Sequence, residues 1–179
     1  MSVVILVSGP VAGGSTTVAK LLAKRLSLDY FSPGMTVKTM IGGEETKAVI
    51  KGLESGLLTN KIFQRELQDR QLQAAHKGNI VIDGKLAIHT LSRFATLSTW
   101  LTASREIRIS RIAQRGNYPY EEAQSLLEAR ETKELDAWHA TLGIDFWSQA
   151  NQADIRVDTS EISPTEVTNT ILTQLARIK

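Results

Sequence analysis

The segment at residues 3–24 constrains the fold more than any other part of the chain. It opens with an unbroken aliphatic run, passes through a glycine-rich stretch at residues 9–17, and continues with Val18 and Leu22 at helical spacing. A short continuous apolar run is typical of a strand buried on both faces, and apolar residues three or four apart indicate an amphipathic helix. The sequence therefore predicts a strand, a glycine-rich turn and a helix in direct succession.

This arrangement is suited to binding phosphate. Glycine has no Cβ, so backbone N–H groups can approach an anion closely, and the start of a helix adds unpaired N–H groups and the positive end of its dipole. A hydroxyl at Thr16 or Thr17 is placed to hold Mg²⁺. The residues expected to contact the phosphates of a nucleotide are Gly9, Pro10, Val11, Ala12, Gly13, Gly14, Ser15, Thr16 and Thr17. A glycine-rich turn that binds nothing is the less favoured alternative.

One position of the loop departs from the common phosphate-binding pattern G-x-x-x-x-G-K-[ST]. The pattern begins at Gly9 and reaches its second glycine at Gly14, but the next residue is Ser15 instead of lysine. The lysine of this pattern brings a positive charge to the β- and γ-phosphates, and a serine hydroxyl carries no charge. Two interpretations follow: a kinase, and a protein that binds phosphate but transfers it poorly or not at all.

Composition narrows the class of protein. The 179 residues are enough for one domain with a hydrophobic core, and 22% charged residues fit a globular protein. A net charge of +2 gives no argument for a nucleic acid or a membrane as partner. There is no cysteine, and the histidines are scattered without the spacing of metal ligands. Because no apolar run is long enough to span a bilayer, we expect a cytoplasmic protein.

The rest of the chain alternates short apolar runs with helical patterns. Further strands are predicted at residues 27–32, 80–84, 95–101 and 153–159. Helices are predicted at residues 36–61, 60–77, 104–114, 120–138 and from 163 onward. Breaks in the first helix are expected at Gly42-Gly43 and Gly52; in the second, the residues expected to face the core are Ile62, Leu67, Leu72 and Ala75. This alternation predicts an α/β fold in a single domain at residues 1–179, with helices on both faces of a parallel sheet.

Seven stretches of the chain together carry a resemblance to a known family. They are SGPVAGGSTTVAKLLAKRL, DYFSPG, ELQDRQLQAAHKGNIVIDGKLA, RISRIAQR, ARETKE, LGID and VDTSEISPTEV, in that order. The chain resembles the nucleoside monophosphate kinases from end to end, most closely the short cytidylate kinases of archaeal type. The resemblance implies a three-layer P-loop NTPase fold with a five-stranded parallel sheet, a nucleoside-monophosphate-binding (NMP-binding) segment at about residues 33–77, and a lid at 108–137. It also implies ATP with Mg²⁺ as donor and CMP or dCMP as acceptor, and we expect a monomer.

The resemblance also assigns individual residues on the acceptor side. The residues expected to bind the acceptor are Ser32, Gly34, Lys38, Asp69, Gly84 and Lys85. In SPGMTVK the family has an arginine at the position of Lys38, which meets the acceptor phosphate, and in DGKLA it has an arginine at the position of Lys85. Lysine keeps the charge at both positions but loses the bidentate fork of arginine.

In the lid, arginines match the family's pattern at several positions. Arg111 and Arg115 match its R-I-x-x-R stretch and form one helical stripe with Arg108, whereas Ala137 stands where the family has a further arginine. Such a stripe is usually a solvated basic face, but a phosphate-facing lid is favoured here because a Gly-Asn-Tyr-Pro break follows it. The residues expected to act in catalysis are Lys38, Lys85, Arg111, Arg115 and Arg130. Candidates for replacing the lost charge are Lys20, Lys38, Lys85 and the lid arginines.

A metal site is expected at Thr16 and Asp83. Asp83 ends the aliphatic run at residues 80–82, where its carboxylate resembles one that orients Mg²⁺ or its waters. An aspartate that merely caps the next turn is an equal alternative.

Three hypotheses for function follow. The first is a cytidylate kinase that transfers the γ-phosphate of ATP to CMP or dCMP. The second is a catalytically degenerate nucleotide-binding homologue, suggested by Ser15 and Ala137. The third is a kinase of the same fold with a different acceptor, another nucleotide or a small alcohol, which the lysines at positions 38 and 85 would allow.

Overall fold

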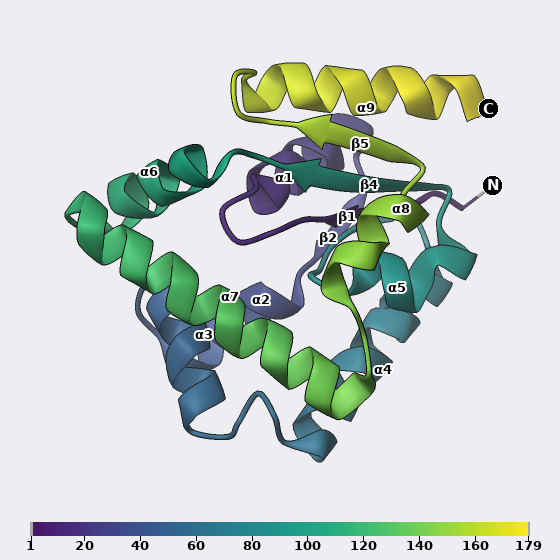
Figure 1. The fold of residues 1–179 in the computed structure, drawn as a ribbon. Helices are drawn as coiled ribbons and strands as arrows, with labels where there is room; N and C mark the ends of the chain where they lie inside the picture. The colour runs from purple at the N-terminus through teal and green to yellow at the C-terminus, as the bar shows by residue number, and fades with distance from the viewer. Residues whose placement is uncertain (1, 179) are drawn as a thin grey trace.

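The computed structural model describes residues 2–178, in which helices cover both faces of one five-stranded sheet (Figure 1). The strands are β1 (Val4–Ser8), β2 (Asp29–Phe31), β3 (Ile80–Asp83), β4 (Leu97–Thr102) and β5 (Ile155–Asp158). They lie in the order β2-β3-β1-β4-β5, and every neighbouring pair is parallel. The predicted α/β fold with a five-stranded parallel sheet is confirmed.

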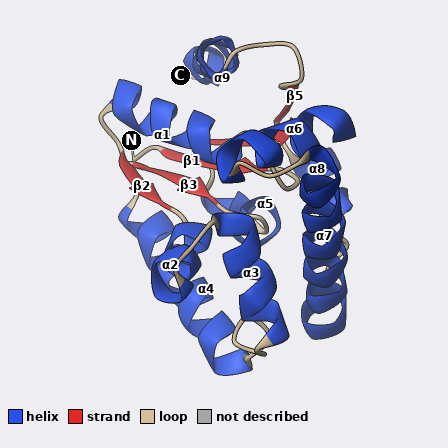
Figure 2. Ribbon diagram, turned by 90° about the vertical axis from the view of Figure 1, so that its left-hand side faces the viewer, coloured by secondary structure: helices blue, strands red, loops and turns tan. Residues whose placement is uncertain are grey.

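Two groups of helices form the outer layers. The helices are α1 (Ser15–Leu26), α2 (Pro33–Ile41), α3 (Glu45–Glu54), α4 (Lys61–Lys77), α5 (Ala87–Leu91), α6 (Arg105–Gly116), α7 (Tyr120–Leu142), α8 (Gln149–Gln152) and α9 (Pro164–Ile178), with 3₁₀ turns at Ser92–Phe94 and Phe146–Ser148. Figure 2 shows α1 and α9 on one side of the strands and α2–α5 on the other. None of the helices within residues 2–178 is long and apolar enough to cross a membrane.

The side chains of the central strand β1 pack into two hydrophobic cores, one on each face of the sheet. Ile5 and Val7 pack in one cluster with residues of α1 and α9, whereas Val4 and Leu6 pack in a second cluster with residues of α4 and α5. All five residues of β1 are buried, as expected for a parallel strand with a helical layer on each face. From β1 the chain first builds the sheet toward β3 and β2, and later toward β4 and β5 on the other side. The loop after β1 therefore lies at the switch point of the sheet, where ligands bind in such folds.

The predicted helix break at Gly52 is wrong. The break at Gly42-Gly43 is confirmed, with φ angles of +79° and +83°, but Gly52 lies inside α3. A Cβ at Gly52 would lie 2.8 Å from Ile41 Cδ1 and 2.9 Å from Leu58 Cγ. This glycine therefore serves the close packing of α3 against its neighbours and does not end the helix.

The predicted inward face of α4 is partly wrong. Leu67 and Ala75 are buried and Leu72 packs partly buried against the core, but Ile62 is 80% exposed. Leu67 follows Ile62 by five positions, which puts them about 140° apart around a helix that turns about 100° per residue. Ile62 therefore points away from the face that Leu67 buries.

Candidate functional site

A cavity of about 380 Å³ lies beside the loop that follows β1. The predicted site residues that line it are Gly9, Pro10, Val11, Ala12, Gly13, Gly14, Ser15, Thr16, Thr17, Ser32, Gly34, Asp83, Gly84, Lys85, Arg111, Arg115 and Arg130. Two predicted residues lie elsewhere: Lys38 is half-buried on α2 and Asp69 is exposed on α4, and neither lines the cavity. The predicted NMP-binding segment corresponds to α2–α4 and the predicted lid to most of α6 and α7.

The backbone of the loop is held by hydrogen bonds to its carbonyl oxygens. The carbonyls of residues 9 to 14 accept, in order, from Lys85 Nζ (2.7 Å), Gly13 N–H (3.0 Å), Arg108 Nη1 (3.3 Å), Arg111 Nη1 (3.1 Å), Thr159 Oγ1 (3.0 Å) and Val18 N–H (3.1 Å). The first N–H groups of α1 have no partner within the helix, and its N-cap residue Gly14 offers no side-chain cap. The carbonyls are thus occupied by the protein, while N–H groups at the start of α1 stay available to an anion.

Two glycines of the loop are required by its geometry. Gly14 has a φ angle of +98°, a conformation that side chains with a Cβ rarely adopt. Gly9 approaches β4 so closely that an added Cβ would lie 2.2 Å from the carbonyl oxygen of Leu101.

Replacing Gly9 with alanine is expected to push the loop away from β4 and to lower the free energy of unfolding by about 1–3 kcal/mol. Urea denaturation measures this loss. Gly34→Ala is the matched control, because the nearest atom to its added Cβ is Ser32 Oγ at 3.7 Å and alanine favours the helix. Equal stability of the two variants would contradict the close approach at Gly9.

Thr16 and Asp83 come together as predicted for a metal site. Thr16 Oγ1 donates to Asp83 Oδ2 at 2.6 Å, and the hydroxyls of Tyr30 and Ser32 donate to the same oxygen at 3.2 and 3.5 Å. Burial raises the pKa of the Asp83 carboxyl, and the hydrogen bond from Thr16 opposes this shift. Among residues 2–178 no backbone N–H donates to the carboxylate of Asp83, so the alternative of a turn-capping aspartate has no support.

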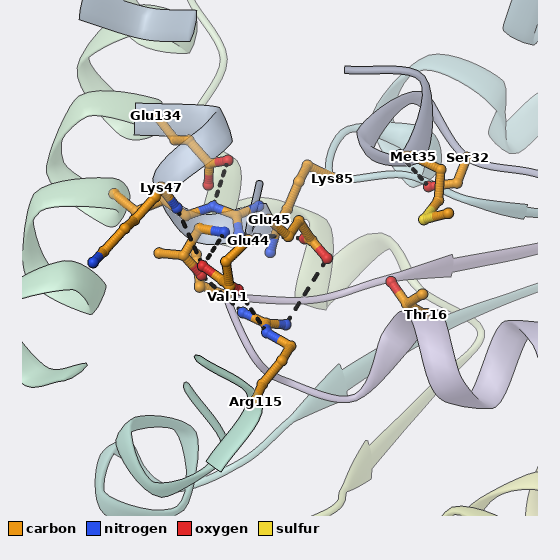
Figure 3. A network of polar contacts seen from close by, with 12 residues as sticks. Val11, Thr16, Ser32, Met35, Glu44, Glu45, Lys47, Lys85, Arg115 and Glu134 are labelled. Atoms are coloured by element: carbon orange, nitrogen blue, oxygen red, sulfur yellow. Dashed lines mark hydrogen bonds and ion pairs between the residues drawn. The ribbon is translucent and has the colours of Figure 1, made fainter. Parts of the chain in front are cut away.

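Carboxylates at the start of α3 contact arginines of α6 and α7, and Figure 3 shows Arg115 beside Glu44 and Glu45. Arg115 Nε lies 2.8 Å from Glu44 Oε1, and its Nη1 lies 3.8 Å from Glu45 Oε2; the first contact is an ion pair without hydrogen-bond alignment. Arg130 Nη1 lies 3.3 Å from Glu45 Oε1, and its Nε lies 3.2 Å from Glu134 Oε1. Burial tends to raise the pKa of the Glu45 carboxyl, but Arg130 and Arg115 outweigh it and hold that pKa below its ordinary value. These ion pairs connect the start of α3 to α6 and α7.

The other arginines of the stripe face the phosphate loop. Arg108 is 8% exposed, bonds to the Val11 carbonyl and pairs with Glu131. Arg111 donates to Thr159 Oγ1 at 2.9 Å and to the Thr159 carbonyl at 2.7 Å, in addition to its bond to the loop. The default interpretation of a solvated basic face is wrong for these residues, because they position the loop.

Lys85 reaches the site from the segment after β3. Burial lowers the pKa of its ammonium group to about 8, although Glu134 opposes this shift. Lys20 and Ala137 do not line the cavity. Three further residues of the site were not predicted from the sequence: Glu45 and Thr159, which line the cavity, and Glu44, which pairs with Arg115 from the start of α3.

Comparisons with known proteins agree on one family. The family described as "Cytidylate kinase-like family" matches residues 4–161. A protein named cytidylate kinase from Sulfurisphaera tokodaii is 32% identical and the match covers 94% of this chain and 92% of that protein. Another protein named cytidylate kinase, from Staphylothermus marinus, is 31% identical over 94% of both chains.

Solved structures with low sequence identity share the fold. Shikimate kinase from Aquifex aeolicus matches with a TM-score of 0.59 and 20% identity, over 97% of this chain and 96% of that chain. Shikimate kinase from Bacteroides thetaiotaomicron matches with a TM-score of 0.64 and 15% identity, over 99% of both chains. These matches support the P-loop kinase fold.

Proposed function

The chain belongs to the cytidylate kinase-like family, and from this premise we propose that it transfers the γ-phosphoryl group of ATP to CMP or dCMP. The observation that carries the proposal is the loop at residues 9–14. Its carbonyl oxygens are all occupied by the protein, and it borders a cavity that also contains the pair Thr16 and Asp83. Such a site suits the phosphates of a nucleoside triphosphate.

The proposed reaction is a direct displacement at phosphorus. An oxygen of the CMP phosphate attacks the γ-phosphorus, the bond between the γ-phosphorus and the β–γ bridging oxygen breaks, and ADP leaves with that electron pair. No side-chain nucleophile is required, because catalysis of phosphoryl transfer depends mainly on positioning and on stabilising charge. The loop would bind the donor phosphates, and the arginines of α6 and α7 would stabilise the transferring group.

The side chains of Thr16 and Asp83 suit Mg²⁺. Their oxygens lie 2.6 Å apart, and hydroxyl and carboxylate oxygens are ligands that Mg²⁺ prefers. Bound there, the ion would neutralise negative charge on the donor phosphates. Tyr30 and Ser32 orient the carboxylate through their hydrogen bonds to it.

The ion pairs of Glu45 bear on how the acceptor would bind. A phosphate oxygen of CMP carries the same sign of charge as Glu45 and can form charge-assisted hydrogen bonds with the same arginines. We expect the acceptor phosphate to compete with Glu45 for Arg115 and Arg130.

The cavity also has an apolar wall that is suited to a nucleotide base. The wall is formed by Ile162, Pro164 and Val167.

Turnover with separate acceptors tests the proposal. ADP formation from ATP and Mg²⁺ is measured with CMP, dCMP, UMP, AMP, GMP or no acceptor, and the highest kcat/KM is expected with CMP or dCMP. Turnover with another acceptor alone would assign a kinase of different specificity. Saturable ATP binding without turnover on any acceptor would replace the proposal with a nucleotide-binding homologue that lacks catalysis.

A further inference from the structure

We propose that Lys85 supplies, from the segment after β3, the positive charge that the phosphate loop lacks at Ser15, and that it acts on the β- and γ-phosphates of the donor. The inference rests on the proposed function, because it requires a nucleoside triphosphate in the cavity. It goes beyond the acceptor-binding and catalytic role that the sequence resemblance implies for Lys85, and it selects Lys85 among the candidates for replacing the lost charge.

The ammonium group of Lys85 lies at the first residue of the loop. Lys85 Nζ donates to the carbonyl oxygen of Gly9, the first residue of the loop, at 2.7 Å. An ammonium group has three N–H donors, and among residues 2–178 this is the one hydrogen bond that Nζ makes. Lys85 lines the same cavity as the whole loop. Two donors and a positive charge are therefore available beside the loop.

The other cations of the cavity are committed to protein partners. Arg111 bonds to the Ala12 carbonyl and twice to Thr159. Arg115 and Arg130 form ion pairs with carboxylates of α3 and α7. Lys85 makes no ion pair with a carboxylate in the described part of the chain. A phosphate can engage Lys85 without breaking an ion pair, and Nζ has fewer protein partners than the guanidinium group of Arg111, which makes three hydrogen bonds.

The surroundings of Lys85 keep it in place. Gln149, which is fully buried, donates from Nε2 to the backbone carbonyl of Lys85 at 3.0 Å and to the Phe146 carbonyl at 3.1 Å. The ring of Phe146 lies with its centroid 5.9 Å from Lys85 Nζ. Figure 3 shows the Lys85 side chain among Glu45, Glu134 and Val11. This support gives Lys85 the preorganised placement that a charge-stabilising group needs.

Lys85→Gln and Ser15→Lys, separately and together, test the inference. Glutamine can still donate to the Gly9 carbonyl but carries no charge. We expect Lys85→Gln to lower kcat/KM for ATP about a hundredfold, and to weaken ATP binding measured by calorimetry while CMP binding changes little. Adding Ser15→Lys to Lys85→Gln is expected to restore most of the loss, because it returns the charge to the loop.

Lys24→Gln is the matched control, since Lys24 is exposed on α1 and does not line the cavity. Weakened CMP binding with unchanged ATP binding in Lys85→Gln would overturn the inference in favour of an acceptor role. Failure of Ser15→Lys to rescue Lys85→Gln would also overturn it. If Lys85→Gln does not fold, Ser15→Lys alone decides. A gain in ATP affinity of more than about tenfold would mean that Lys85 had not supplied the charge and would overturn the inference, whereas a smaller gain would support it.

The two proposals fail in different ways. If the wild type turns over no acceptor, the proposed kinase function fails. ATP binding by the wild type, Lys85→Gln, Ser15→Lys and the double variant still tests the role of Lys85. If the wild type turns over CMP and Lys85→Gln matches it at all ATP concentrations, the inference about Lys85 fails alone. Absence of ATP binding to the wild type would overturn both.

Discussion

Replacing Arg130 with methionine is expected to lower the free energy of unfolding by about 3–5 kcal/mol, because it removes the partner of buried charges. Arg130 is 4% exposed and lies between Glu45 and Glu134. Arg115 remains as a partner for Glu45, but Glu134 has no other ion pair within residues 2–178. An uncompensated buried carboxylate costs much more than the loss of an exposed pair.

The effect is measured by chemical denaturation at neutral pH. The matched control is Arg105→Met, which removes an arginine paired with Glu128 where both side chains are about half exposed. We expect that control to lose about 0–1 kcal/mol. Similar losses in the two variants would mean that the Arg130 network contributes no more than a surface ion pair.

The ion pairs of Arg130 also make the free energy of unfolding depend on pH. The pKa of Glu45 is held below its ordinary value of 4.5 in the folded protein. A carboxyl with a lowered folded-state pKa contributes stability above its unfolded-state pKa, and that contribution is lost as the pH falls through the folded-state value. The wild type is therefore expected to lose stability between about pH 5 and pH 3 more steeply than Arg130→Met. The measurement is the free energy of unfolding against pH, and parallel curves for the two proteins would contradict the role of Arg130 in lowering the pKa of Glu45.

Asp83→Asn is expected to reduce ATP turnover by about a hundred- to a thousandfold, because it removes the carboxylate that faces Thr16. The midpoint of thermal unfolding is not expected to fall. Burial raises the pKa of Asp83, so the ionised carboxylate costs folding free energy that a neutral amide of similar shape avoids.

The Mg²⁺ concentration for half-maximal rate separates a metal role from a structural one, and we expect it to rise in Asp83→Asn. Asp136→Asn is the matched control, because Asp136 is exposed on α7 and does not line the cavity. Activity within tenfold of the wild type, or unchanged Mg²⁺ dependence, would exclude the proposed metal role of Asp83.

Sequence patterns could predict the sheet and the loop because both are local. The aliphatic runs at β1 and β3 and the glycines between β1 and α1 are visible within a few residues of each other. The short helices α5 and α8 were not predicted, because four or five residues are too few to show a helical period. Gly52 shows a further limit of prediction from sequence. A glycine that is needed for close packing inside a helix cannot be distinguished there from one that ends a helix.

The partners of the arginines could not be predicted, because they come from distant elements. Glu45 meets Arg130 across 85 positions, and Thr159 meets Arg111 across 48. A signal for Glu44 was present, since an acidic residue after Gly42-Gly43 can cap a helix, and Glu44 does accept from the N–H groups of Thr46 and Lys47. That signal predicts the start of a helix but not the ion pair between Glu44 and Arg115.

The carbonyl contacts of the phosphate loop have a consequence for folding. Residues 85, 108, 111 and 159 lie 76, 97, 99 and 146 positions from the loop residues whose carbonyls they bind. Contacts at such separations form late, because their loop-closure entropy must be overcome first. A nascent chain that has completed β1 and α1 therefore has the glycine sequence without the shape that binds nucleotide. Nucleotide affinity would report that the last strand has joined the sheet, and ligand binding would stabilise the whole domain instead of its first segment.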